Sequence, residues 1–312
     1  MIAFFYESVK RLKEKNNPYW KYLYKVNKVL VNLLYPIGQR WKKTGRLDEN
    51  SRIIVSLTTY PARAGSVWIT IASLLQQTMP PYKVILWLAE EQFKDRRIAK
   101  NLERMQKRGL DIRFCEDLKS HKKYYYAMQE YPDYYILTAD DDIFYPEDHI
   151  EKLWRGYEKY PDTIICHWSH QVGITDQKNF YPYNDWIDNT EAEPSYATLA
   201  VGCNGILYPP GSLPEEAFHK QIIMEAAFYT DDLWLKCMEI LNQRKTVNCN
   251  KTILIYFNRL STKGSGLWNS NIGQEKRNDN SWNRLMELYP EVKAVLLEET
   301  LKPGKEISGS AR

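Results

Sequence analysis

Three consecutive carboxylates, Asp140, Asp141 and Asp142, follow a strongly apolar stretch that runs from Tyr134 to Ala139. Carboxylates this close repel one another, so the run is costly unless a positive charge lies beside it. If the chain stays extended, side chains alternate, so Asp140 and Asp142 share one side and Asp141 points away. Oxygen ligands of this kind suit Mg2+ or Mn2+ that carries the phosphates of a substrate. The run therefore predicts a divalent metal site.

A second interpretation of the acidic run is a solvated turn that leads into a helix. Asp is common in turns and at helix N-caps, and Pro146-Glu147-Asp148 resembles the start of a helix. Capping requires one Asp and not three, so we favour the metal site.

The elements that must position the acidic run alternate along the first half of the chain. Apolar runs predict buried strands at 52–58, 83–88, 111–115 and 134–139. Helical spacing of apolar residues predicts helices at 66–77, 94–108 and 121–131. This rhythm indicates the α/β class, a mostly parallel sheet flanked by helices. Ligands of such sheets bind at the carboxyl ends of strands, where the acidic run and the loop at 58–60 both fall.

The second half of the chain has a less regular pattern. It predicts a strand at 161–168, a strand-like element with two glycines at 200–208, and a helix at 230–241 with Thr230 as its N-cap. Residues 169–194 are polar and aromatic without a clear period. We expect them to form a long loop that faces the substrate.

The composition is that of an ordinary globular protein of 312 residues, with 44% hydrophobic and 26% charged residues. No run approaches the roughly 20 apolar residues that span a bilayer, and no secretory signal is evident at the start. The five cysteines are scattered and form no CxxC pair, which favours free thiols in a reducing cytoplasm.

The positive charge of the chain is concentrated at its start. Residues 1–46 hold eleven Lys and Arg against two Glu, a formal charge of +9, so the remainder carries −5 of the net +4. Nine aromatic residues accompany them, a mixture that suits the surface of an anionic membrane. The alternative is a helical appendage packed on the main domain with its lysines solvated. No motif that reads DNA or RNA is present, so we expect no nucleic-acid partner.

With these elements in place, the chain resembles a nucleotide-sugar-dependent glycosyltransferase of the GT-A type, close to bacterial family 2-like enzymes of surface polysaccharide synthesis. The resemblance covers about residues 51–290 and lies in an ordered set of motifs. These are IIVSLTTYPAR, SLLQQTMPPYKVILWL, KKYYYAMQEYPDYYILTADDDIFYP, GCNGILYPP and TDDLWL. It implies a GT-A, Rossmann-like fold at 51–300, preceded by a basic helical segment at 1–50 and followed by a disordered tail at 301–312.

The resemblance assigns roles on the donor side of the site. Asp142 would bind the metal, and Asp140 would help to bind it or approach the ribose or the donor sugar. Thr58, Tyr60 and Arg63 match the loop that family members place around the nucleotide. Lys123, or its neighbour Lys122, matches a basic position near the donor. The alternative for Arg63 and both lysines is a plain surface position.

The resemblance also assigns roles to residues on the acceptor side of the site. Asp232, supported by Asp231, would be the catalytic base that deprotonates an acceptor hydroxyl. Its alternative is an acidic first turn that only stabilises the dipole of a helix. Gly202, Asn204 and Gly205 match a flexible loop that contacts sugar, with a strand bulge as the alternative.

The implied reaction moves a hexose from a nucleotide sugar, expected to be a UDP-sugar, to a saccharide acceptor in capsule or O-antigen type polysaccharide synthesis. The expected cofactor is Mn2+ or Mg2+, and the reaction is expected to invert the configuration of the anomeric carbon. The acceptor is expected to be linked to a lipid. The enzyme is therefore expected to be a peripheral protein on the inner face of the cell membrane. Two rivals are a sugar nucleotidyltransferase, which usually needs a glycine-rich basic loop after the first strand, and a non-catalytic carbohydrate-binding scaffold.

The sequence departs from the resemblance at the metal site. Many GT-A enzymes supply a further ligand, often His, from near the C-terminus, but the last His here is His219. Asn258, Ser261, Thr262 or water would have to replace it. His167 and His170 have no second ligand pair at zinc spacing, so we interpret them as structural histidines.

Overall fold

The computed structural model describes most of the chain. The described residues are 1–42, 44–175, 177–190, 192–250, 252, 254–260 and 276–300. Ser261, Thr262 and the predicted tail at 301–312 lie outside them.

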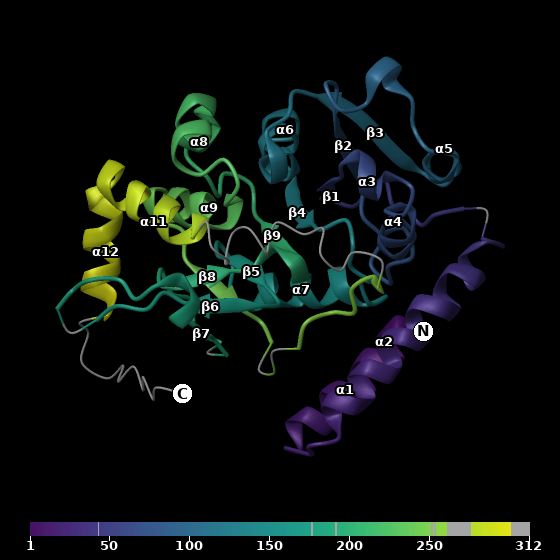
Figure 1. Cartoon of the computed structure of the whole chain (residues 1–312), viewed down its shortest axis with the longest axis horizontal. Helices are drawn as coiled ribbons and strands as arrows, with labels where there is room; N and C mark the ends of the chain where they lie inside the picture. Colours follow the sequence, from purple (N-terminus) through teal and green to yellow (C-terminus); the bar gives the residue numbers. More distant parts are fainter. Residues whose placement is uncertain are drawn as a thin grey trace.

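A seven-stranded sheet forms the centre of the protein, in the order β10-β5-β9-β4-β1-β2-β3 (Figure 1). Its strands are β1 (Ile53–Thr58), β2 (Lys83–Ala89), β3 (Leu110–Cys115), β4 (Tyr135–Ala139), β5 (Ile164–Cys166), β9 (Ile206–Tyr208) and β10 (Thr246–Asn248). All pairings are parallel except those of β9, which is antiparallel to both β4 and β5. The predicted α/β class with a mostly parallel sheet is therefore confirmed.

Helices cover both faces of this sheet. On one face, residues such as Val55 and Leu86 pack in a core with α1 (Ile2–Glu14), α2 (Trp20–Gln39), α4 (Trp68–Leu74), α5 (Lys100–Gln106) and α7 (His149–Lys159). On the other face, Ile54 and Ile136 pack against α6 (Lys122–Glu130). The far end of this second face is covered by α8 (Lys220–Ala226), α9 (Asp231–Leu241), α11 (Arg277–Leu288) and α12 (Pro290–Thr300). Both faces of the parallel strands are thus buried, as their continuous apolar runs require.

Two predicted helices differ from the structure. The helix expected at 66–77 is observed as the shorter α4 and is preceded by one extra helical turn, α3 (Pro61–Ala64), whereas the helix expected at 94–108 is divided into the short 3-10 helix η1 (Lys94–Arg96) and α5. Asp95 and Arg96 both have positive φ, which breaks the second of these helices. The chain ends α5 before Gly109, which has φ of 105° and was the predicted stop.

The long loop predicted at 169–194 is interrupted by short elements. This region contains β6 (Ser169–Gln171), the 3-10 helix η3 (Tyr183–Asp185) and β7 (Ile187–Asp188). Together with β8 (Thr198–Ala200), β6 and β7 form a small antiparallel sheet in the order β7-β6-β8. Strands of two or three residues are too short to show an alternating pattern, so no periodic signal predicts them.

The N-terminal segment is helical, as predicted, and forms α1 and α2 side by side along one edge of the protein (Figure 1). Ile2, Tyr6, Val31 and Tyr35 are buried in the same core as β1 and β2. A domain boundary at residue 50 stays a prediction, but these contacts make the segment part of the main body. No helix in the described part of the chain is long and apolar enough to cross a membrane.

Candidate active site

The acidic run lies at the carboxyl edge of the parallel sheet. β1 and β4 are neighbours, with Leu57 opposite Ala139, so the loop after β1 and the acidic run after β4 leave the sheet side by side. A cavity of about 790 Å3 opens over this edge. Thr58, Tyr60 and Arg63 line it together with all three aspartates. The residues predicted to surround the nucleotide are therefore brought together at one cavity.

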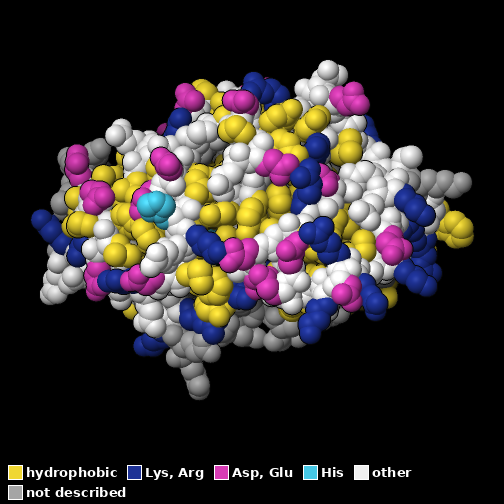
Figure 2. All heavy atoms as spheres, turned by 90° about the horizontal axis from the view of Figure 1, so that it is seen from above, with side chains coloured by type: hydrophobic (Ala, Val, Ile, Leu, Met, Phe, Trp, Pro, Cys, Tyr) yellow, Lys and Arg dark blue, Asp and Glu magenta, His cyan; other side chains and the backbone are white. Residues whose placement is uncertain are grey.

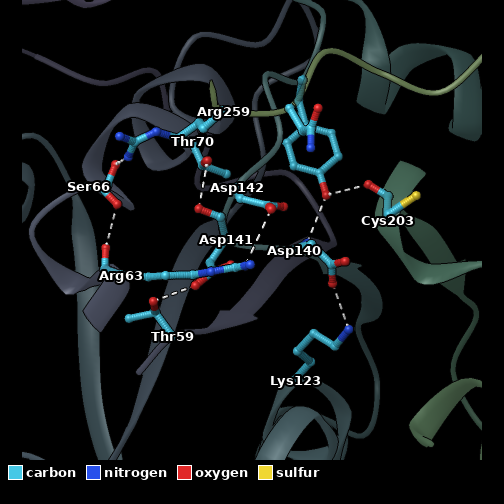
Figure 3. A network of polar contacts seen from close by, with 12 residues as sticks. Thr59, Arg63, Ser66, Thr70, Lys123, Asp140, Asp141, Asp142, Cys203 and Arg259 are labelled. Atoms are coloured by element: carbon cyan, nitrogen blue, oxygen red, sulfur yellow. Dashed lines mark hydrogen bonds and ion pairs between the residues drawn. The ribbon is translucent and has the colours of Figure 1, made fainter. Parts of the chain in front are cut away.

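Asp141 is the most buried carboxylate of the run, and Arg63 neutralises it (Figure 3). It is only 7% exposed, accepts a hydrogen bond from the Thr59 hydroxyl at 2.5 Å, and pairs with an Arg63 nitrogen at 2.6 Å. Burial raises the pKa of Asp141, although Arg63 and Thr59 oppose that change. The same arginine lies 3.4 Å from Asp142, so one partly buried guanidinium holds two members of the run in place.

The acidic run forms a turn and does not continue the extended strand, which ends at Ala139. Contacts therefore decide where each carboxylate lies, and the two-residue period does not. Asp140 faces Lys123 on the opposite side of the cavity from Arg63 (Figure 3), and its backbone N–H donates to the Tyr145 hydroxyl at 2.8 Å. That hydroxyl donates in turn to the carbonyl of Cys203 at 3.1 Å. Tyr145 was missed at the sequence level, because nothing in its position marks it as polar support.

Lys123 connects the acidic run with the second acidic pair. Its Nζ lies 2.9 Å from Asp140 Oδ1 and 3.1 Å from Asp231 Oδ2, and the side chain is almost completely buried. Burial lowers its pKa, but the carboxylates Asp140 and Asp231 more than compensate and hold the pKa well above the ordinary value. Lys122 is also buried and pairs with Asp117 at 2.5 Å. Neither lysine is a solvated surface residue.

A second, smaller cavity of about 270 Å3 adjoins the first. Both cavities are lined by Lys123, Asp140, Trp168 and Cys203. The smaller one also contains Gly202, Asp231 and Asp232, and its aromatic walls come from Trp168, Tyr183 and Tyr229. The two predicted halves of the site therefore share one wall.

Asp232 lies in the first turn of α9 and faces the glycine turn of η4 (Gly202–Asn204). The backbone N–H of Gly202 donates to Asp232 Oδ2 at 3.2 Å. A Cβ on residue 202 would lie 3.0 Å from Asp232 Oδ1, so a glycine allows this close approach. Burial, with Asp231 as the second cause, raises the pKa of Asp232 to about 8. For Asp231 burial acts in the same direction, but Lys123 outweighs it and lowers the pKa.

Asn204 and Gly205 are not brought to either cavity. Asn204 is fully buried, donates to the Leu254 carbonyl at 3.2 Å and accepts from the Tyr256 N–H at 3.1 Å. Gly205 has φ of 82° and packs against His149, where a Cβ would meet the imidazole. Both residues shape the turn that presents Gly202, and their predicted contact with sugar stays a prediction.

The chemistry of the cavity fits a divalent cation. Asp140 and Asp142 are 33% and 16% exposed at their side chains and offer carboxylate oxygens to the same space. No third His, Cys, Asp or Glu joins them within the described residues. Mg2+ commonly binds through one or two carboxylates, with water and substrate phosphates completing its shell. Asn258, a predicted replacement ligand, lines the cavity but already accepts a hydrogen bond from Lys28.

The predicted structural histidines have partners of their own. His167 is buried with its Nδ1 3.2 Å from Cys249 Sγ, and His170 lies 3.3 Å from Asp188. All five cysteines are free thiols.

Comparison with protein families finds that residues 55–205 match the model of glycosyl transferase family 2. The matched region runs from β1 to the glycine turn and contains the acidic run, but it ends before Asp231 and Asp232. Comparison with curated protein sequences finds no significant match.

Among solved structures, S. aureus TarS residues 1–349 is similar over 81% of this chain and 72% of its own, with 12% identity and a TM-score of 0.45. Its complex with UDP-GlcNAc matches over 82% and 68%, with 12% identity and a TM-score of 0.44. A CMP:2-keto-3-deoxy-manno-octonic acid synthetase complexed with CTP matches over 63% and 88%, with 12% identity and a TM-score of 0.37. These are loose resemblances of fold.

Proposed function

We propose that this chain, whose residues 55–205 match the model of glycosyl transferase family 2, moves a hexose from a nucleotide sugar to a saccharide acceptor. The proposed donor is a UDP-sugar. One observation carries this proposal: the cavity at Asp140 and Asp142 shares a wall with the cavity at Asp232. A donor held by its phosphates in the first would present its sugar to an acceptor in the second.

Asp140 and Asp142 are the residues that would hold Mn2+ or Mg2+. When bound, the ion would neutralise the diphosphate that leaves with the nucleotide. Thr58 and Tyr60 line the same cavity and are proposed to contact the nucleotide. Arg63 is already paired with Asp141, so its proposed contribution to donor binding is mainly to fix the acidic run.

Asp232 is the proposed catalytic base. An acceptor hydroxyl in the smaller cavity would give its proton to an Asp232 oxygen while the hydroxyl oxygen attacks the anomeric carbon. The bond from that carbon to the leaving phosphate oxygen breaks in the same step, which inverts the configuration. The Gly202 N–H holds the carboxylate in place, and Asp231 is paired with Lys123, so Asp231 is assigned a supporting role.

The proposed acceptor is a lipid-linked saccharide of capsule or O-antigen type. Trp168, Tyr183 and Tyr229 in the smaller cavity supply apolar ring faces of the kind on which sugar rings stack. An acceptor of this kind would require the enzyme to work as a peripheral protein at the inner face of the cell membrane, with the basic segment 1–46 as the contact.

Calorimetry with UDP in the presence and absence of Mn2+ tests the donor half of this proposal. The wild-type chain should bind UDP with metal, and Asp142→Asn should weaken that binding at least about tenfold, because a metal ligand is lost. Asp95→Asn, at an exposed position of η1, is the matched control and should bind as wild type does. Unchanged metal-dependent binding in Asp142→Asn would refute the metal assignment.

The sugar itself is tested by a panel of nucleotide sugars, with release of free nucleotide as the readout. One UDP-hexose should be turned over preferentially in the presence of Mn2+. Turnover of a sugar phosphate and a nucleoside triphosphate into a nucleotide sugar would instead identify a nucleotidyltransferase.

A further inference from the structure

The helix α2 presents an apolar stripe to solvent. Tyr22, Val29, Leu33 and Ile37 follow one another at intervals of seven, four and four residues, which places them on one side of the helix, and Trp41 continues the stripe just beyond the end of the helix at Gln39. Leu33 is 60% exposed, Ile37 55% and Trp41 82%. The outer face of a helix on a soluble protein normally carries polar residues. An apolar outer face therefore indicates a surface that binds another molecule or a membrane when the protein functions.

The core does not account for this stripe, because the opposite side of α2 already faces the protein. Val31 and Tyr35 are buried in the core, and Asn27 donates to the carbonyl of Phe5 in α1. Nine of the sixteen large apolar side chains exposed in the described part of the chain lie within residues 1–42. The exposed apolar surface is thus concentrated on the N-terminal helices.

The charged residues of the segment that carries the stripe are all positive. No Asp or Glu occurs from Lys15 to Arg46, and the basic residues next to the stripe, Lys21, Lys25, Arg40 and Lys42, are exposed. By contrast, acidic and basic side chains are intermixed on the face of the protein that Figure 2 shows. An apolar stripe flanked only by Lys and Arg complements an anionic lipid surface, which offers acyl chains beneath negative headgroups.

The inner side of α2 reaches the wall of the larger cavity. Lys28 donates to the side chain of Asn258, Asn32 donates to the Asn258 carbonyl at 3.2 Å, and Asn32 accepts from the Leu260 N–H at 3.1 Å. Tyr24 and Asn258 both line that cavity. The next residue, Arg259, donates its backbone N–H to the carbonyl of Asp142 at 2.9 Å. A short chain of hydrogen bonds thus runs from α2 to the acidic run.

We propose that the apolar stripe of α2 docks the protein on an anionic bilayer, and that docking strengthens donor binding through Asn32 and Asn258. The first part stands on the surface alone, whereas the second rests on the proposed function. A bilayer that fixes α2 would also fix the segment 254–260, which forms one wall of the donor cavity. Coupling of this kind is reciprocal, so the donor should strengthen membrane binding by the same factor.

Sedimentation of the full chain with vesicles tests docking without any donor. Vesicles of equal parts phosphatidylcholine and phosphatidylglycerol should bind the protein, and pure phosphatidylcholine should bind it much less. The triple variant Leu33→Ser, Ile37→Ser, Trp41→Ser should lose about tenfold or more in affinity, because the apolar contacts are removed. Met224→Ser with Leu288→Ser, at exposed apolar positions elsewhere, is the matched control and should bind as wild type does.

Several results of this first experiment would overturn docking. Equal sedimentation of the triple variant and wild type would do so, as would equal binding to both vesicle types. A concentration-dependent dimer that the triple variant abolishes, without vesicle binding, would identify a second copy of the chain as the occupant instead.

Calorimetry of UDP with Mn2+, with and without the anionic vesicles, tests the coupling. Vesicles should tighten UDP binding of the wild type about fivefold or more, and Asn32→Ala should bind vesicles normally but lose this response. The same UDP affinity with and without vesicles would contradict coupling and leave docking intact. If UDP does not bind under any condition, the donor proposal fails, and the vesicle experiment still decides docking.

Discussion

The two acidic motifs of the site, Asp140–Asp142 and Asp231–Asp232, share one arrangement of charges. In each motif one carboxylate is buried against a cation: Asp141 pairs with Arg63, and Asp231 pairs with Lys123. The neighbouring carboxylates face a cavity. Adjacent acidic residues are therefore tolerated because one of them is neutralised by the protein and fixes the backbone for the others.

The difference between the motifs lies in how far the cation reaches. Of the two acidic motifs, Arg63 pairs with the run after β4 alone, with both Asp141 and Asp142 within 3.4 Å. Lys123 contacts Asp140 of that run and also Asp231 of the second pair. The first motif thus has a scaffold of its own, whereas the charge near Asp232 depends on a lysine that also faces the donor side.

The largest expected effect is the loss of sugar transfer on replacement of Asp232, the proposed base in the second motif. Asp232→Asn should lower sugar transfer by about 100- to 10,000-fold, because the acceptor hydroxyl loses its base. Binding of UDP with Mn2+ should stay at the wild-type level, because Asp140 and Asp142 are untouched. Nucleotide release in the presence of acceptor measures the first quantity and calorimetry the second.

Asp142→Asn is the matched comparison for this prediction, because it should lose both transfer and metal-dependent binding. If Asp232→Asn transfers sugar at a rate near wild type while Asp142→Asn does not, the base lies elsewhere or the reaction retains configuration.

The second expected effect concerns the scaffold of the first motif. Arg63→Met leaves Asp141 buried without its cation and should lower the free energy of unfolding by about 3–5 kcal/mol, measured by urea denaturation. Arg96→Met breaks an ion pair between exposed side chains, with Glu90, and should cost less than about 1 kcal/mol. Adding Asp141→Asn to Arg63→Met should recover much of the loss. A cost for Arg63→Met no greater than that of the Arg96 control would show that Asp141 does not need its cation.

The same contrast explains how much of the fold could be predicted. The first four strands were predicted at 52–58, 83–88, 111–115 and 134–139, and they are observed at Ile53–Thr58, Lys83–Ala89, Leu110–Cys115 and Tyr135–Ala139. β1, β2 and β4 are apolar runs with most residues buried, which is the pattern that burial on both faces produces, whereas β3 is an edge strand with Asp111 and Arg113 among its apolar residues. Strands of the second half, such as β6 and β8, have three residues each and are held by pairing with distant segments. Such pairing leaves no local pattern.

The candidate site likewise has a part that the sequence predicts and a part that it does not. The meeting of Thr58, Tyr60 and the acidic run follows from the rule that parallel strands present their carboxyl ends at one edge. The contact of Lys123 with Asp231 does not, because it depends on how α6 and α9 pack beside the sheet. The support of Asp140 by Tyr145 is similarly invisible in the sequence, since a tyrosine after an acidic run has many possible partners.

The smallest expected effect is a pH dependence that reports the charge around Asp232. A base works only when it is ionised, so a pKa of about 8 predicts that transfer rises about tenfold per pH unit below 8 and levels off above it. Asp231→Asn removes a neighbouring negative charge that raises this pKa, so the rise should move to lower pH. Initial rates at saturating donor and Mn2+ between about pH 6 and 9 measure both profiles. A rise at the same pH in both proteins would exclude Asp231 as a cause.

Stability provides an independent readout of the same group. The folded-state pKa of Asp232 lies above its ordinary value of 3.8, so the native protein holds a proton that the unfolded chain releases. The stabilisation from this proton is complete below about pH 4 and is lost as the pH rises through about 8. Asp232→Asn cannot titrate, so its free energy of unfolding should fall less steeply than that of the wild type between these limits. Equal slopes in urea denaturation would mean that the base titrates as an ordinary aspartate, and that burial beside Lys123 and Asp231 leaves it ionised at neutral pH.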